Sequence, residues 1–301
     1  MKHLYIGVDV GSGSARAGLF DAAGKKLAQA VSPIKQFRPK RDFVEQSSTD
    51  IWAQVCNVVQ SVVKNAGIHP EQVKGIGFDA TCSLVAVDGD NQPVSVSPTG
   101  NDDHNIIMWM DHRALEETAE INNSASEALK YVGGEVSPEM ELPKILWLKR
   151  HLPEQYQRIH RFFDLADYLV FRATGQDVRS VCTKVCKWTY LAHEQRWDTR
   201  LLEHIGLADL ITDEKVGQTI AELGTAAGTL TDTAAKQLGL SVLTTVAVGI
   251  IDAHAGGVGI IGTQPESTLA IIGGTSSCHM AVSKQPIFVN GVWGPYWGAM
   301  V

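Results

Sequence analysis

Ile6-Gly7-Val8-Asp9-Val10-Gly11-Ser12-Gly13-Ser14 is the stretch that decides the fold of this 301-residue chain. Its pattern is that of a short buried strand, a glycine- and serine-rich turn and a returning strand. Ala270-Ile271-Ile272-Gly273-Gly274-Thr275-Ser276-Ser277 repeats that plan about 260 residues later. A weak repeat at that distance indicates two related domains rather than a solenoid. We therefore expect a first domain at residues 1–259 and the beginning of a second at 260–301.

The segments around the first stretch predict an α/β fold. We expect three strands, a helix that begins near Ser47-Ser48-Thr49-Asp50, and two further strands, at Leu4 to Val8, Ala15 to Phe20, Lys25 to Val31, Val73 to Phe78 and Leu84 to Val87. This order favours a mixed sheet with antiparallel pairs, flanked by helices. Further on, the spacing predicts helices over 113–122, 142–151 and 164–173, and a strand over 246–250 that leads into Asp252.

Composition and charge limit the kinds of molecule that this chain is expected to bind. The net charge of -7 comes without a basic block, which argues against nucleic acid and anionic membranes as partners. The apolar run at the N-terminus is too short for a signal peptide, and no apolar stretch approaches the roughly 20 residues that span a bilayer. Five cysteines in a chain of this length give no disulfide framework, so we expect a reduced, cytoplasmic protein. Cys182 and Cys186 could ligate a metal, but no second Cys or His pair accompanies them, and we expect no metal there.

Asp9 and the turn after it have the chemistry of a phosphate site. A turn of small residues lets backbone N–H groups approach phosphate, hydroxyls add hydrogen bonds, and a guanidinium adds positive charge. The residues expected to do this are Gly11, Ser12, Gly13, Ser14 and Arg16. Asp9 could hold Mg²⁺ through water, since magnesium gives up its waters reluctantly. The alternative is a hairpin turn beside an exposed carboxylate.

The second turn has the same chemistry without an acid. We expect Gly273, Gly274, Thr275 and Ser276 to bind phosphate, with a simple tight hairpin as the alternative. Two such turns across a cleft could hold a polyphosphate from both sides, as phosphoryl transfer requires.

Asp252 follows a predicted strand and is expected at a helix N-terminus. The helix dipole would favour its ionised form, and a carboxylate there could accept a proton from a hydroxyl that attacks phosphorus. The alternative is an ordinary helix-capping aspartate.

Three segments combine the groups that bind a polyol. Carboxylates and Arg bind hydroxyls, and an aromatic face covers a carbon skeleton. The segments are Trp109-Met110-Asp111-His112-Arg113, then Asp79-Ala80-Thr81-Cys82-Ser83, and Lys184 with Lys187 and Trp188. Each could instead be a structural cap, a strand connection or a solvated charge.

Several of these motifs, in this order, resemble the FGGY carbohydrate kinases. The two turns resemble the phosphate loops of that family, and Gly249-Ile250-Ile251-Asp252-Ala253-His254-Ala255 resembles its catalytic-base segment. The Asp-Ala-His-Ala sequence and Trp109-Met110-Asp111-His112-Arg113-Ala114 are typical of the ribulokinase-like branch. The resemblance implies an actin/hexokinase-like (ribonuclease H-like) fold and phosphorylation of a sugar by ATP with Mg²⁺.

The same resemblance assigns roles to individual residues. Asp252 would be the base for the terminal hydroxyl, and Asp9 would organise Mg²⁺. Asp111 and Lys187 would contact the sugar, although Lys184 lies only three residues from Lys187, and Ala80 to Ser83 would shape the pocket. Thr81-Cys82-Ser83-Leu84-Val85 resembles the signature of D-ribulokinases, whereas the Arg-Glu pair of glycerol kinases is replaced here by Ala80-Thr81. D-Ribulose, converted to its 5-phosphate, is therefore the expected substrate.

Other readings stay open from sequence. Ribitol, L-ribulose or xylulose could replace D-ribulose, and the fold could serve a non-catalytic nucleotide sensor or chaperone. Family members continue well past 301 residues and carry their adenine-binding loops there. We therefore expect this chain alone to be a sugar-binding fragment without measurable kinase activity. A homodimer is allowed. Trp293 and Trp297 are expected to be core or interdomain residues that are left exposed because the sequence stops inside its second domain.

Overall fold

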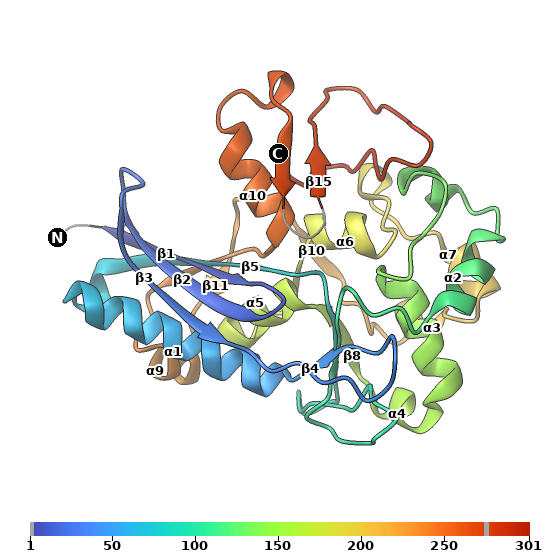
Figure 1. Ribbon diagram of the computed structural model, residues 1–301, viewed down its shortest axis with the longest axis horizontal. Coiled ribbons are helices and arrows are strands. Elements are labelled where there is room, and N and C mark those ends of the chain that lie inside the picture. The colour runs from blue at the N-terminus through green and yellow to red at the C-terminus, as the bar shows by residue number, and fades with distance from the viewer. Residues whose placement is uncertain (1–2, 274–276) are drawn as a thin grey trace.

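A seven-stranded mixed sheet forms one side of the molecule in the computed structural model, which describes residues 3–273 and 277–301 (Figure 1). The strand order is β11-β12-β5-β1-β2-β3, and β13 also pairs with β5. These strands are β1 (Leu4–Val10), β2 (Ser14–Asp21), β3 (Lys26–Pro33), β5 (Val73–Ala80), β11 (Ala226–Thr229), β12 (Thr245–Ala247) and β13 (Ile250–Ile251). β1, β2 and β3 pair antiparallel, whereas β1, β12 and β13 are each parallel to β5. The predicted mixed sheet is confirmed.

Three helices cover one face of this sheet and complete its core: α1 (Ser48–Ala66), α5 (Leu165–Thr174) and α9 (Asp232–Leu238). α1 begins where predicted, because the Ser47 side chain accepts a hydrogen bond from the Asp50 N–H at 3.2 Å. It ends at Gly67, whose φ of 61° is readily adopted only by glycine. Its buried residues recur at helical spacing and face the sheet: Ile51, Trp52, Val55, Val58, Val59 and Val62.

The middle of the chain builds a second, mostly helical part beside the sheet, with its own hydrophobic core (Figure 1). A four-stranded sheet of order β4-β7-β6-β8 joins the two parts, and β9 pairs with β10. The strands are β4 (Glu45–Gln46), β6 (Leu84–Val87), β7 (Ile106–Ile107), β8 (Arg161–Asp164), β9 (Val178–Ser180) and β10 (Thr219–Ala221). The helices are α2 (Leu115–Asn122), α3 (Glu141–His151), α4 (Pro153–Arg158), α6 (Val181–Lys187), α7 (Thr199–His204) and α8 (Asp209–Thr212). Short 3₁₀ turns occupy Pro70–Gln72, Glu127–Tyr131, Ala192–Glu194 and Pro265–Ser267.

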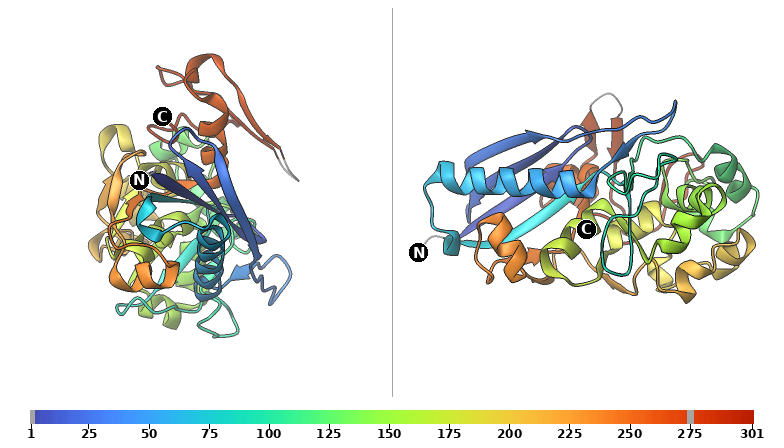
Figure 2. Two further views of the ribbon diagram at one scale, coloured as in Figure 1. Left: turned by 90° about the vertical axis from the view of Figure 1, so that its left-hand side faces the viewer. Right: turned by 90° about the horizontal axis from the view of Figure 1, so that it is seen from below.

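The last elements are α10 (Asp252–Ile261) and an antiparallel hairpin of β14 (Ala270–Gly273) and β15 (Ser277–Met280). Figure 2 shows the hairpin projecting from the rest of the molecule, next to α10. Gly273 ends β14, but Gly274, Thr275 and Ser276 lie outside the described residues, so the second phosphate turn stays a prediction. The predicted strand over 246–250 is corrected: it is split into β12 and β13 at Val248-Gly249.

Residue 249 has to be a glycine because the chain between β12 and β13 passes very close to α5. A Cβ at residue 249 would lie 3.0 Å from the Ala166 carbonyl oxygen and 3.1 Å from the Ala166 Cβ. Gly249→Ala is therefore expected to lower the free energy of unfolding by about 1–3 kcal/mol, because the backbone of α5 has to shift. Chemical denaturation measures this. Gly7→Ala is the matched control, since a Cβ at that strand glycine meets nothing within 4 Å. Equal stability of the two variants would contradict the prediction.

Candidate active site

Three carboxylates meet where parallel strands end. Asp9 near the end of β1 is the register partner of Asp79 near the end of β5. Ile250 pairs with Asp79, so Asp252, the first residue of α10, follows directly at the same edge. This is the carboxyl edge of the sheet, where α/β folds place their ligands. The expected position of Asp252 at a helix N-terminus is confirmed.

Burial and mutual repulsion make these carboxylates hard to ionise together. Burial raises the pKa of Asp79 to about 8, and the neighbouring Asp9 and Asp252 add to that shift. Burial also raises the pKa of Asp252, against the opposing effect of a 2.7 Å hydrogen bond from the Ala253 N–H. Burial raises the pKa of Asp9, although Arg16 acts in the other direction. The cluster therefore favours a proton or a cation.

The oxygen donors of this cluster fit Mg²⁺, which is bound in proteins by carboxylates and water. Asp9 and Asp79 lie at the same edge on adjacent strands, and burial is the main cause of the raised pKa of each. Sequence reasoning gave Asp79 only as part of a pocket wall and missed its place beside Asp9. The available signal was that Asp79 ends a strand parallel to the one that ends near Asp9.

Two side-chain amides hold the predicted first phosphate turn in place through hydrogen bonds to a backbone carbonyl. The Ser12 carbonyl accepts hydrogen bonds from the side-chain amides of Gln36 at 2.8 Å and Gln46 at 3.1 Å. Arg16 crosses the turn: its Nη1 lies 3.0 Å from an Asp9 oxygen, and its Nε donates to the Ser14 hydroxyl at 3.2 Å. A Cβ on Gly11 would lie 3.1 Å from this guanidinium, so glycine leaves room for it. With its side chain 53% exposed, Arg16 is accessible to an anion.

Trp109 joins this turn to the predicted polyol wall. Its indole N–H donates to the Ser12 hydroxyl at 2.9 Å, and its backbone N–H donates to the Ser83 hydroxyl at 3.1 Å. The Ser83 hydroxyl also lies 3.2 Å from that of Thr81. Ala80 to Ser83 are all buried, and Cys82 packs with α6 and β13. Trp109 thus connects the 80–83 segment, through its backbone N–H, with the turn at Ser12, through its indole N–H.

The carboxylate of Asp111 is buried in an ion-pair network, and its expected sugar contact stays a prediction. Its side chain is 0% exposed. One oxygen accepts from Arg113 Nε at 2.9 Å, and the other accepts from Arg113 Nη2 at 2.8 Å and from the Val44 N–H at 2.6 Å. Arg113 also binds Glu45 at 2.9 Å and the Val96 carbonyl at 2.7 Å. Asp111 is part of a buried ion-pair network that fixes the 109–113 segment.

Lys187, rather than Lys184, lies beside the 80–83 segment. Lys184 is fully buried, with its Nζ 3.8 Å from the Trp188 ring centroid, and burial lowers its pKa to about 7. Burial acts to lower the pKa of Lys187 as well, but Cys82 and two nearby glutamates outweigh it and raise the pKa. Lys187 is therefore the cationic residue of this wall, and it also acts on the pKa of Asp252.

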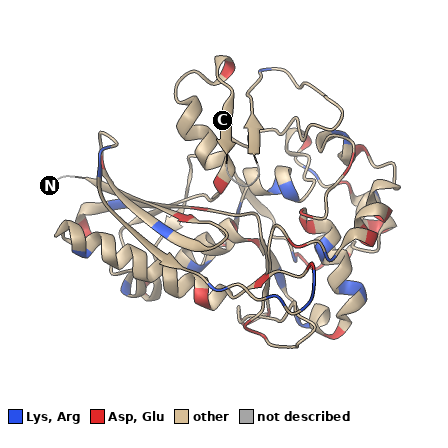
Figure 3. Ribbon diagram, viewed as in Figure 1, with Lys and Arg blue, Asp and Glu red and all other residues tan. Residues whose placement is uncertain are grey.

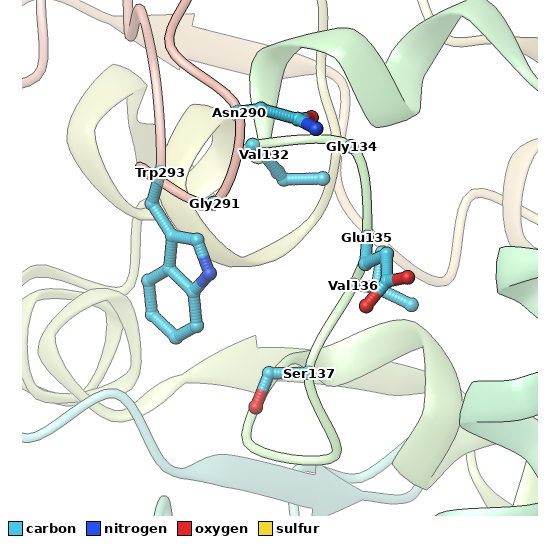
Figure 4. A pocket seen from close by; sticks show the side chains of 9 residues that line it. Val132, Gly134, Glu135, Val136, Ser137, Asn290, Gly291 and Trp293 are labelled. Atoms are coloured by element: carbon cyan, nitrogen blue, oxygen red, sulfur yellow. The ribbon is translucent and has the colours of Figure 1, made fainter.

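A pocket of about 490 Å³ lies between residues 132–137 and the segment that contains Trp293 (Figure 4). Residues 132–137 form one wall, and Asn290, Gly291 and Trp293 form the other. Trp293 is 42% exposed, as expected, and the Lys187 Nζ lies 4.6 Å from its ring centroid. The pocket combines an aromatic face with polar groups, including Glu135, Ser137 and Asn290. None of the three carboxylates lines it.

The sheet and its helices have the actin/hexokinase-like α/β fold, and the three carboxylates lie at the carboxyl edge of that sheet. A profile of the FGGY family of carbohydrate kinases, N-terminal domain, matches residues 4–259, and the chain belongs to this family. The chain is 49% identical to the human FGGY carbohydrate kinase domain-containing protein, over 100% of the chain and 57% of that protein. It is 46% identical to a D-ribulokinase of Saccharomyces cerevisiae, over 97% of the chain and 46% of that protein.

A solved structure has the same fold. Gluconate kinase from Lactobacillus acidophilus superposes with a TM-score of 0.81 at 21% identity, over 95% of this chain and 55% of that one. The chain therefore spans about half the length of the relatives it matches.

Charge and helix length bear on the expected partners. Figure 3 shows Lys and Arg interspersed with Asp and Glu in both parts of the molecule. Among the described residues, no helix is both long enough and apolar enough to cross a membrane. The absence of nucleic-acid and membrane partners, the homodimer and the cytoplasmic location all stay predictions.

Proposed function

We propose that this chain supplies the sugar site and the first phosphate turn of an ATP-dependent kinase that phosphorylates the terminal hydroxyl of a pentulose, D-ribulose in the first place. The observation that carries the proposal is Asp252, a half-buried carboxylate at a helix N-terminus that shares one edge of the sheet with Asp9 and the turn after it. Family membership supports the sugar-kinase class.

Asp252 accepts the proton of the terminal hydroxyl as that oxygen attacks the γ-phosphorus of ATP. Its 2.7 Å hydrogen bond with the Ala253 N–H and the nearby ammonium of Lys187 favour the ionised form that a base requires. Both effects act against burial, which favours the protonated form. Asp252 can therefore ionise and act as a base although it is only partly exposed to solvent.

The phosphate chain of ATP binds the turn at 11–14, with Arg16 moving from Asp9 to the phosphates. Asp9 and Asp79 would hold Mg²⁺, which neutralises phosphate charge when bound. The opposite half of the polyphosphate site is assigned to Gly273, Gly274, Thr275 and Ser276. Lys187, Cys82 and Thr81 orient the sugar hydroxyls at the 80–83 wall.

D-Ribulose is favoured over other sugars by Thr81-Cys82-Ser83 and by the yeast relative that is named a D-ribulokinase. The alternatives are ribitol, L-ribulose and xylulose as substrates, or a chain that binds sugar without catalysis. Arg and Glu are absent at Ala80-Thr81, which disfavours glycerol.

A sugar panel tests the substrate. With ATP and the longest form of the protein that the gene encodes, ADP release should give a kcat/KM for D-ribulose at least about tenfold above that for L-ribulose, xylulose or ribitol. The difference from glycerol should be larger, because glycerol leaves buried polar groups unpaired. A preference for another pentulose would replace the substrate, and no turnover with any sugar would contradict the kinase itself.

A further inference from the structure

The three-dimensional arrangement adds a ligand that the sequence did not place beside Cys182 and Cys186. These cysteines lie four residues apart on α6, so their side chains share one face of that helix. His254 on α10 comes from 68 positions further along the chain, and its Nε2 lies 3.5 Å from the Cys186 Sγ. The two sulfurs and one imidazole nitrogen all lie within 4.8 Å of one another. The reasoning that excluded a metal for lack of a second Cys or His pair missed this contact.

We propose that Cys182, Cys186 and His254 bind one thiophilic divalent cation of the Zn²⁺ class, which clips the first turn of α10 to α6. The ligand set is two sulfurs and one nitrogen, the kind that zinc prefers and that magnesium does not. This site is separate from the carboxylates of Asp9 and Asp79, which supply only oxygen.

The observed spacing is close to what a tetrahedral site needs. Zinc bonds of about 2.3 Å to sulfur and 2.0 Å to nitrogen place neighbouring ligand atoms roughly 3.5–3.8 Å apart. The distance from Cys186 to His254 already has that value, and no separation in the group would have to close by more than about 1 Å. Small changes of side-chain rotamer suffice for this. A fourth position is left to water, because His254 is partly exposed.

Charge and surroundings also suit a metal. Cys182 and Cys186 are 0% and 2% exposed, among apolar neighbours that include Val181, Val185 and Ile251. Binding would release the two thiol protons to solvent, and two thiolates with a divalent cation form a neutral unit that can stay buried. Burial lowers the pKa of His254 to about 4, so its imidazole is neutral and has a free lone pair. Its Nδ1 has no hydrogen-bond partner among the described residues.

The clip would act on the position of Asp252. His254 lies two residues after Asp252 within the first turn of α10, and Cys186 immediately precedes Lys187 on α6. A metal shared by the two helices would fix the distance between the carboxylate and the ammonium. The role of the metal is therefore structural, and its binding can be tested without any assay of the proposed kinase activity.

Titration of the reduced chain with Co²⁺ tests the proposal without any activity assay. We expect one Co²⁺ per chain, with the intense visible bands of tetrahedral coordination and sulfur-to-metal charge transfer, and release of two protons. Zn²⁺ should displace the Co²⁺, whereas Mg²⁺ should not. Weak octahedral spectra, or no spectral change in the unmodified chain, would overturn the site regardless of any variant.

Variants assign the ligands. Cys182→Ser, Cys186→Ser and His254→Gln are each expected to weaken Co²⁺ binding by at least about 100-fold, the upper end of what loss of an outer-shell partner costs. Cys278→Ser, at an exposed cysteine, and Cys56→Ser, on α1, are the controls and should bind like the unmodified chain. Circular dichroism confirms that each variant is folded. Binding unchanged in the first three variants, or lost in the controls, would refute the assignment.

Discussion

Asp252→Asn is expected to lower kcat by about 10²–10⁴-fold, because the terminal hydroxyl then loses the group that takes its proton. This corresponds to roughly 2.7–5.5 kcal/mol of transition-state stabilisation. The asparagine has nearly the same shape and still accepts a hydrogen bond from the Ala253 N–H, so KM for the sugar should change little. Steady-state kinetics on the longest form of the protein that the gene encodes measures both constants.

The matched control is Asp232→Asn. Asp232 is also the first residue of a helix, α9, but it is exposed and remote from the three carboxylates. Its replacement should leave kcat unchanged. If Asp252→Asn keeps more than about a tenth of the kcat, it falls short of even the smallest effect expected for a general base, and another residue takes the proton.

Arg113→Met is expected to lower the free energy of unfolding by about 3–5 kcal/mol. The methionine keeps most of the side-chain volume but leaves Asp111 and Glu45 as buried carboxylates without their common partner. It also loses the stacking of the guanidinium over Phe43, whose ring centroid lies 4.1 Å away. Denaturant unfolding of the 301-residue chain measures the change.

Arg158→Met provides the comparison for this ion pair. Arg158 pairs with Asp102 at 2.8 Å, but both side chains are about half exposed. Water replaces such a partner, so the expected change is within about 1 kcal/mol. Similar losses of unfolding free energy in Arg113→Met and Arg158→Met would contradict the prediction, because burial would then not increase what the Arg113 ion pairs contribute to stability.

Local sequence signals predicted the elements well. Ser47 caps α1 through its own side chain, and Gly175 ends α5 with a φ of 70°, and both effects depend only on neighbouring residues. The phosphate turn after Asp9 is likewise a local feature. The succession of strands and helices along the predicted segments, and the place of Asp252 at the start of a helix, followed from such signals.

Contacts between distant segments could not be predicted in the same way. The pairing of Asp79 with Asp9 depends on the register of β5 against β1, which no local pattern specifies. His254 reaches Cys186 only because α10 packs beside α6. The ion pair of Asp111 was missed for a similar reason: the sequence shows an acid beside an aromatic residue, but not that Arg113, two positions later, donates to both oxygens of that acid.

Trp109 has one further consequence, for the thermodynamics of the two substrates. Its indole N–H donates to the Ser12 hydroxyl, in the turn proposed to bind phosphate, and its backbone N–H donates to the Ser83 hydroxyl, in the segment proposed to shape the sugar pocket. Under the proposed function, a phosphate that takes the Ser12 hydroxyl must release the indole, and a sugar that moves Ser83 shifts the same residue. We then expect sugar and ATP to bind with linked affinities, each changing the dissociation constant of the other by an equal factor.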